Sequence, residues 1–366
     1  LFMKYFVFIV FFSFCLTLHA QGLDNEPTLN EAFAKAKVEN KLVFVEYFNA
    51  DCPVCKRLEP LFSDSLMRAF YNKNFVNYKL DTQKDKREDK AFMDSLKLKP
   101  ESVPMFFFFD KNKQFVHFSY TKQDVKYLLE IGEDALSPIE RAANLATKYK
   151  AGDRTIRTLY AYSNLTQLYN QDSLRTVLAN ELFKAFPTAN LSTKKSYTIM
   201  KHCVTNIENG FFQYWINHIE QLEGFEIEPD KGYKEKATLG KIISTSINSK
   251  ASKTWDLEKI KAVKAMITKV ELSDNPDVFL WQQEAYLLEQ ANRSSEALQL
   301  CHRLLTHPKT DIPTAAYYLD FFIAILTEKK DLDVVKKYLD EQASKATEAE
   351  DKASFERIKA VFLKKM

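Results

Sequence analysis

Two cysteines separated by two residues, in a Cys-Pro-Val-Cys sequence at 52–55, are the residues best suited to chemistry in this chain. The apolar segment 41–48 precedes them with the composition of a buried strand, and apolar residues follow at helical spacing over 56–70. We therefore expect Cys52 at a strand-to-helix turn, where unpaired N–H groups and the helix dipole favour a thiolate. Cys55 would lie one helical turn later, close enough to attack a mixed disulfide on Cys52. The spacing predicts a redox-active dithiol, since structural disulfides rarely join residues so close in sequence.

The first twenty residues resemble a targeting segment. Lys4 is followed by an apolar run over 5–16 and by the small residue Ala20. This pattern predicts a secretory signal peptide, residues 1–20, cleaved after Ala20, with an uncleaved membrane anchor as the alternative. No later stretch is apolar enough to cross a bilayer, so we expect no stable membrane insertion after cleavage. The predicted location is periplasmic or secreted, where disulfides can exist.

Composition limits the classes of function. The 366 residues are 46% hydrophobic, enough for two globular domains, and the net charge of +3 does not favour a nucleic acid partner. Signal cleavage would remove Cys15 and leave four cysteines, too few for a domain held together by disulfides. Cys203 and Cys301 lie in apolar helical stretches and are interpreted as core residues, with a bridge between them as the alternative. The histidines are scattered, so neither a metal site nor a cofactor is predicted.

The order of helical and strand patterns predicts an α/β domain over residues 24–135. Its expected helices span 28–39, 56–70, a short segment ending near Leu98, and 122–131, closed by Gly132. Its expected strands span 41–48, 75–80, 103–109 and 114–119, with a hairpin turn at 110–113.

Several residues of this domain resemble the thioredoxin superfamily. The segment around the cysteines is similar to the family's active-site segment, with Asp51 where a tryptophan is usual. Glu46 stands where the family keeps a buried acid beneath the disulfide, and Pro60 matches the proline that kinks its active-site helix. Val103-Pro104 matches the hydrophobic residue and cis-proline that face the cysteines. The resemblance covers about a third of the chain and implies a thioredoxin fold, with a central mixed sheet flanked by helices.

The resemblance implies a thiol–disulfide oxidoreductase that reduces or exchanges protein disulfides, with Cys52 as nucleophile and Cys55 as resolving thiol. Burial on an inward strand position would raise the pKa of Glu46, so that its carboxylate can take the proton from Cys55. A solvated carboxylate on an edge strand is the alternative. The basic residues Lys56 and Arg57 would add modest attraction for a thiolate on Cys52.

Substrate contact is expected at three residues. The backbone of Val103 would pair with an extended substrate strand, with Pro104 and Asp51 beside it. The alternative for Pro104 is a proline at the start of a strand. Val54 cannot donate a side-chain hydrogen bond to the thiolate, which favours a reductant or isomerase over a dedicated oxidase. A reductase outside the cytoplasm must be recharged, so we expect a membrane-embedded electron donor.

Residues 139–366 are predicted to form an all-α domain of amphipathic helices broken at glycines and prolines. The segment 281–305 resembles a tetratricopeptide hairpin, but no clean period repeats, which indicates an array of helical hairpins. We expect this domain to supply a recognition or self-association surface, with mere shielding of the catalytic domain as the alternative. A chain ending near Leu136 should then fold and act on small disulfides. The alternative function is a non-catalytic binding module in which the helical array recognises a partner.

Overall fold

The computed structural model describes residues 22–84, 87–120, 122–222, 224–226 and 234–366. These residues form two compact units, the first ending at Asp172 and the second running from Ser173 to Met366. The predicted signal peptide, residues 1–20, lies outside the described residues. None of the helices in the described ranges combines the length and the apolar character needed to span a membrane.

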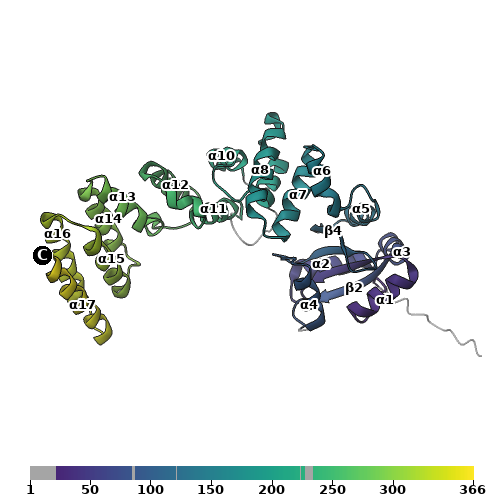
Figure 1. Cartoon of the computed structure of the whole chain (residues 1–366), viewed down its shortest axis with the longest axis horizontal. Coiled ribbons are helices and arrows are strands. Elements are labelled where there is room, and N and C mark those ends of the chain that lie inside the picture. Colours follow the sequence, from purple (N-terminus) through teal and green to yellow (C-terminus); the bar gives the residue numbers. More distant parts are fainter. Residues whose placement is uncertain (1–21, 85–86, 121, 223, 227–233) are drawn as a thin grey trace, which may run out of the picture. The chain divides into compact units, whose positions relative to one another are not determined.

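The first unit is built on a four-stranded mixed sheet with helices packed against it (Figure 1). The strands lie in the order β2-β1-β3-β4, in which β1 runs parallel to β2 and antiparallel to β3, and β3 runs antiparallel to β4. The strands are β1 (Leu42–Phe48), β2 (Phe75–Asp81), β3 (Met105–Phe109) and β4 (Phe115–Tyr120). The helices are α1 (Leu29–Glu39), α2 (Pro53–Phe62), α3 (Ser65–Asn74), α4 (Arg87–Ser95) and α5 (Val125–Leu136).

Helices cover both faces of the sheet. Successive side chains of a strand point to opposite faces, and the runs of buried apolar residues in β1 and β3 therefore place apolar side chains on both. On one face, Phe44 of β1 and Phe106 of β3 belong to a core shared with α2, α3 and α5. On the other face, Phe109 of β3 contacts Phe33 of α1 and Phe92 of α4, with ring centroids 6.2 and 5.0 Å away. This arrangement confirms the predicted α/β fold with a mixed central sheet.

Two predicted helix boundaries were wrong. The single helix expected over 56–70 is two helices, because the Asp64 carboxylate accepts hydrogen bonds from the N–H groups of Leu66 and Met67 and starts α3 anew. Gly132 does not close the last helix, since α5 continues through it to Leu136. A Cβ atom at Gly132 would lie 2.5 Å from the ring of Phe70, so glycine is needed there for close packing.

The first compact unit extends beyond the expected end of the thioredoxin-like domain at residue 135. It includes η1 (Ala142–Asn144), α6 (Leu145–Lys150) and α7 (Ile156–Leu168). The backbone N–H of Ala142 donates to Nδ1 of His117 on β4 at 3.0 Å, and Arg157 forms an ion pair with Asp134 at 2.9 Å. These contacts attach the helices that follow α5 to the sheet and to α5 itself.

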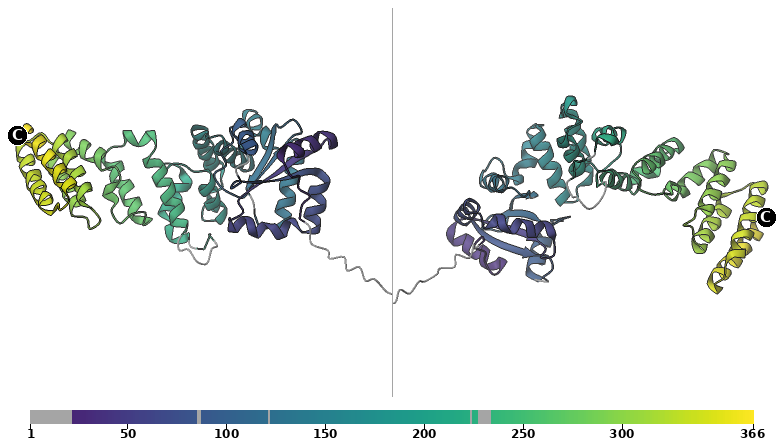
Figure 2. Two further views of the ribbon diagram at one scale, coloured as in Figure 1. Left: turned by 90° about the horizontal axis from the view of Figure 1, so that it is seen from below. Right: turned by 180° about the vertical axis from the view of Figure 1, so that it is seen from behind.

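The second unit contains only helices in its described part, which confirms the predicted helical array. Consecutive helices from α13 to α17 pack side by side (Figure 2). Cys203 on α9 and Cys301 on α14 are both buried, as predicted for core residues. The α-helices are α8 (Asp172–Ala185), α9 (Lys194–Cys203), α10 (Gly210–Asn217), α11 (Lys234–Ile247), α12 (Leu257–Lys269), α13 (Trp281–Gln290), α14 (Ser294–Thr306), α15 (Ile312–Ile325), α16 (Lys329–Lys345) and α17 (Ala349–Lys365). Short 3-10 turns lie at η2 (Thr188–Asn190), η3 (Ile219–Gln221), η4 (Lys250–Thr254) and η5 (Pro276–Val278).

Candidate dithiol active site

Cys52 lies at the turn between β1 and α2 and is the N-cap residue of α2. Its sulfur accepts a hydrogen bond from the backbone N–H of Cys55 at 3.3 Å, and Pro53 occupies the first position of the helix, where no N–H is needed. Cys52 is partly exposed, whereas the side chain of Cys55 is almost fully buried. The structure therefore places one accessible thiol and one covered thiol on the same helical turn.

The two thiols differ in acidity. Burial by itself would raise the pKa of Cys52, but hydrogen bonds from the Cys55 thiol and from the backbone N–H groups of Cys55 and Val54 outweigh it, with help from the charge of Arg57. The net result is a lowered pKa. Burial raises the pKa of Cys55 to about 12, and the hydrogen bond to Cys52 and the charges of Cys52 and Glu46 act in the same direction. The thiolate therefore forms more readily on Cys52 than on Cys55.

The loop before β3 faces the accessible cysteine. The Val103–Pro104 peptide bond is cis, and the thiol of Cys52 lies 3.9 Å from the carbonyl oxygen of Val103. Sequence reasoning expected these residues opposite the cysteines, and the structure brings them there. Their role in binding an extended substrate strand stays a prediction.

Glu46 lies beneath the cysteines because of strand alternation. It is two residues after Phe44 on β1, so it shares the sheet face against which α2 packs, and only 2% of its surface is exposed. Burial is the largest effect on its carboxyl and raises the pKa to about 7, against the opposing charge of Lys79. Its Oε1 atom is buried and has no hydrogen-bond partner among the described residues. The structure thus supports the buried position and not the solvated one.

Lys79 is a site residue that sequence reasoning missed. It lies opposite Glu46 in the parallel register of β1 and β2, and its ammonium group is 3.4 Å from Oε2 of Glu46. The same ammonium group donates a hydrogen bond to Oε1 of Glu59 on α2. Burial would lower the pKa of Lys79, but the two carboxylates outweigh it, so its pKa is raised and the group stays charged. The strand pattern over 75–80 was visible in the sequence, but the register that pairs Lys79 with Glu46 was not.

Asp51, the residue before the first cysteine, is exposed, and both its carboxylate and its backbone N–H form hydrogen bonds with neighbouring residues. Its Oδ2 atom accepts a hydrogen bond from Nε2 of Gln83 at 2.7 Å. Its backbone N–H donates to the side chain of Asn49, which helps to shape the turn before Cys52. The expected contact between Asp51 and a substrate stays a prediction.

The C-terminal end of α7 is tied to the segment that leads into the cis-proline loop. The N–H of Lys99 donates to the carbonyl oxygen of Leu168 at 2.8 Å, and the side chain of Gln167 donates to the Glu101 carboxylate. Gln167 also accepts a hydrogen bond from the Tyr120 hydroxyl at 3.5 Å. A helix outside the expected domain therefore holds the loop that carries Val103. No local pattern in the sequence signals such a contact.

The fold and the dithiol together define a thioredoxin-like protein with a role related to thiol–disulfide chemistry. Residues 13–151 match a family model described as Thioredox_DsbH, "Protein of unknown function, DUF255". This part of the chain belongs to the thioredoxin superfamily. A search of curated proteins gave no match to this chain.

One similar solved structure is the solution structure of a "putative disulphide-isomerase" from Bacteroides thetaiotaomicron. It is 28% identical to this chain, and the alignment covers 32% of this chain and 95% of that one, with a TM-score of 0.28.

Among the residues that the structure describes, no group of three or more histidine, cysteine or acidic side chains is placed to hold a metal ion.

Proposed function

We propose that this protein is a periplasmic or secreted thiol–disulfide oxidoreductase that reduces or exchanges protein disulfides through Cys52 and Cys55. The observation that carries the proposal is the pairing of a partly exposed thiol of lowered pKa with a buried thiol of raised pKa, next to a cis-proline loop. The thiolate is the nucleophile in disulfide exchange, so Cys52 attacks first.

The reaction consists of two exchanges. The Cys52 thiolate attacks one sulfur of a substrate disulfide, the substrate S–S bond breaks, and the other substrate sulfur leaves as a thiolate that takes up a proton. Cys55 then loses its proton to Glu46, directly or through a water molecule, and attacks the sulfur of Cys52. The second substrate sulfur is released, and the protein is left with a Cys52–Cys55 disulfide after giving two electrons to the substrate.

The direction of the reaction depends on what recharges the dithiol. Val54 places no polar side chain next to the thiolate, which favours a reductant or an isomerase over a dedicated oxidase. A reductant in this compartment needs two electrons for each turnover, and we propose that a membrane-embedded electron donor supplies them. An equilibrium potential against glutathione near roughly −270 mV would support this direction, and one near roughly −120 mV would contradict it.

Trapping tests the proposal directly. Cys55→Ala should accumulate a mixed disulfide between Cys52 and a protein substrate such as insulin, because no resolving thiol remains. Cys52→Ala should form none, and the unaltered protein should reduce insulin after prior reduction. Absence of the adduct in Cys55→Ala together with absence of insulin reduction would rule out the proposed activity.

The alternative, a binding module without catalysis, predicts a different outcome for one variant. Double replacement of Cys52 and Cys55 by alanine should abolish the activity and the cellular phenotype under the proposed function. If partner capture and phenotype both survive the double replacement, the helical unit binds its partner without any need for the dithiol.

A further inference from the structure

We propose that Glu59, on the outer side of α2, is a positioning residue for the buried acid–base group Glu46 and acts through Lys79, which lies between the two carboxylates. This inference rests on the proposed function, because it concerns the proton transfer that activates Cys55. It assigns a role to a residue that lies between Cys55 and Pro60 in α2 and has no part in the two exchanges.

The geometry places one cation between two unequal anions. The ammonium group of Lys79 is 3.4 Å from Oε2 of Glu46 and makes its closer contact with Oε1 of Glu59. The Glu59 side chain is 51% exposed, whereas that of Glu46 is 3% exposed. Lys79 is further held over the ring of Phe48, 4.8 Å from its centroid. Its position is therefore set on the solvent side by Glu59 and on the strand side by Phe48.

Lys79 is shared between two carboxylates, and the groups around Glu46 make this important for the ionisation of Glu46. Its neighbour on β2 is Lys79, its neighbour on β3 is the apolar Phe106, and α2 contributes Glu59 and the thiol of Cys55. Lys79 is thus the cation that stabilises the charged form of Glu46. The hydrogen bond to Glu59 holds the ammonium group of Lys79 toward Glu59, which limits how closely it approaches Glu46 and how strongly it stabilises the Glu46 carboxylate. The negative charge of Glu59 also opposes ionisation of Glu46 directly, with a smaller effect than the charge of Lys79.

The consequence for the reaction follows from the sign of this effect. Removing the charge of Glu59 leaves Lys79 to Glu46 alone, which favours the ionised carboxylate and makes it a weaker base. The acidic limb of the resolving step should therefore move to lower pH by roughly half a unit to one unit. The plateau rate of that step should fall as well, because proton transfer is most efficient when the pKa of the base lies near the working pH.

The test follows the resolving step alone. Cys52 is loaded with a coloured aromatic thiol as a mixed disulfide, and release of the thiol by Cys55 is timed as a function of pH. Glu59→Gln should shift the midpoint of the acidic limb downward. Glu130→Gln on α5, which removes one equally exposed carboxylate away from the site, should leave the midpoint unchanged. Glu59→Asp keeps the charge and should restore the midpoint toward that of the unaltered protein.

A double variant separates action through Lys79 from direct repulsion. Lys79→Met should move the midpoint upward. Adding Glu59→Gln to it should move the midpoint down by less than Glu59→Gln does in the otherwise unaltered protein, because only the direct repulsion remains to be removed. A full downward shift in the Lys79→Met background would show that Glu59 acts directly and would overturn the inference. So would a Glu59→Gln profile that coincides with that of Glu130→Gln. If instead the unaltered protein forms the mixed disulfide but releases no thiol, the proposed function fails together with the inference.

Unfolding midpoints of the variants show whether any loss of rate reflects damage to the fold. If Glu59→Gln is poorly folded, Glu59→Ala and Glu130→Ala are compared instead, with the ¹³C chemical shift of the Glu46 carboxyl carbon reporting its titration without turnover. A lower titration midpoint in Glu59→Ala than in Glu130→Ala would agree with the inference, and equal midpoints in the two variants would contradict it.

Discussion

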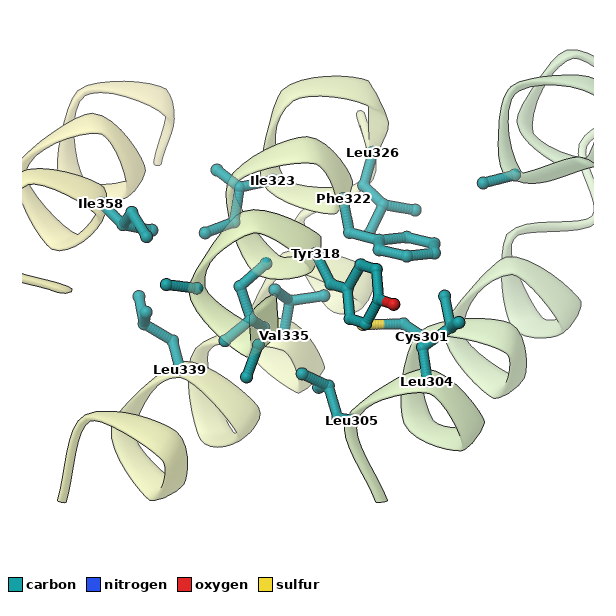
Figure 3. Packing of buried hydrophobic residues seen from close by; sticks show 14 of the residues in the cluster. Cys301, Leu304, Leu305, Tyr318, Phe322, Ile323, Leu326, Val335, Leu339 and Ile358 are labelled. Atoms are coloured by element: carbon teal, nitrogen blue, oxygen red, sulfur yellow. The ribbon is translucent and has the colours of Figure 1, made fainter. Parts of the chain in front are cut away.

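Cys52 in the first unit and Cys301 in the second show how differently two cysteines of one chain can be used. Cys52 caps a helix N-terminus, is partly exposed and has a lowered pKa. Cys301 lies inside α14, is fully buried, and burial raises its pKa far above the usual range. Figure 3 shows it packed among side chains that include Leu304, Tyr318 and Phe322. The difference comes from the surroundings, since a thiol becomes reactive only where its anion is stabilised.

The surroundings of the dithiol and the apolar cluster around Cys301 differ in the same way. The first unit buries a carboxyl group beneath its dithiol, and that group is matched by a single shared lysine. The core around Cys301 is made of aliphatic and aromatic residues from α13 to α17. A buried carboxyl costs stability when it ionises, whereas an apolar core does not depend on pH. The buried carboxyl group of Glu46 therefore lowers the stability of the first unit when it ionises, whereas the apolar side chains around Cys301 carry no such cost.

The largest expected effect concerns the two thiols themselves. Cys52→Ser should lower disulfide reduction to the rate seen without protein, because a serine hydroxyl does not form the anion that attacks sulfur at neutral pH. Cys301→Ala should keep the rate of the unaltered protein. Insulin reduction and reduction of a small aromatic disulfide measure both variants. An equal loss of reduction rate in Cys52→Ser and Cys301→Ala would show that the two cysteines do not differ in the proposed reaction.

A second prediction concerns where the reactive region ends. A chain of residues 22–172 should reduce a small disulfide at the rate of the longer protein, and one ending at Leu136 should be slower by about tenfold or more or should not fold. The shorter chain loses the hydrogen bonds from Lys99 to Leu168 and from Ala142 to His117. This reverses the expectation from sequence that a chain ending near Leu136 would suffice. Steady-state rates and circular dichroism of both chains decide between the two expectations.

The third prediction uses the pH dependence of stability. The pKa of the Glu46 carboxyl is about 7 in the folded protein, against 4.5 for a solvated glutamate such as that of the unfolded chain. Between these two pH values the folded protein keeps the proton and the unfolded chain loses it. The contribution of Glu46 to the free energy of unfolding should therefore fall as pH rises from about 4.5 to about 7, by at most about 3 kcal/mol. Burial lowers the pKa of His117 and His202 to about 4, and these two groups contribute the opposite pH dependence over much of the same interval. The contribution of Glu46 is therefore measured as the difference between the unaltered protein and Glu46→Gln, in which both histidines are retained. Glu46→Gln should remove this decrease and be the more stable protein at pH 8. Urea unfolding at several pH values checks the sign, and an unchanged pH dependence in Glu46→Gln would count against a raised pKa.

The smallest effect is expected at Cys301. Cys301→Ala should lower the unfolding free energy by about 1 kcal/mol, because a small cavity replaces the sulfur. Cys301→Ser should cost more than Cys301→Ala, by about 1–2 kcal/mol, because a hydroxyl must be buried among apolar side chains. Denaturant unfolding followed by tryptophan fluorescence, to which Trp281 in this core contributes, measures both variants. A serine variant as stable as the alanine variant would indicate a more polar environment than the structure has.

Local sequence was enough to predict where the dithiol lies in the fold. The strand over 41–48 and the helix after it predict that Cys52 lies at a strand-to-helix turn, which the structure confirms. For Glu46 the sequence favoured an inward position but left a solvated one open, and the structure shows the buried position. The cis form of Val103–Pro104 was likewise expected, from the resemblance to the thioredoxin superfamily. These features depend on residues close together in the chain or on a recognisable motif, so periodicity and spacing carry them.

Only the tertiary structure decided which distant residues meet at that centre. Lys79 reaches Glu46 because of the register between β1 and β2, and it reaches Glu59 because α2 packs over that pair. Leu168 of α7 reaches Lys99 across a long stretch of intervening chain. Neither contact follows from the propensity or spacing of its own segment. The placement of Cys52 and Cys55 was thus determined locally, while the residues that surround them were selected by long-range packing. A single sequence does not encode such pairings in any short pattern.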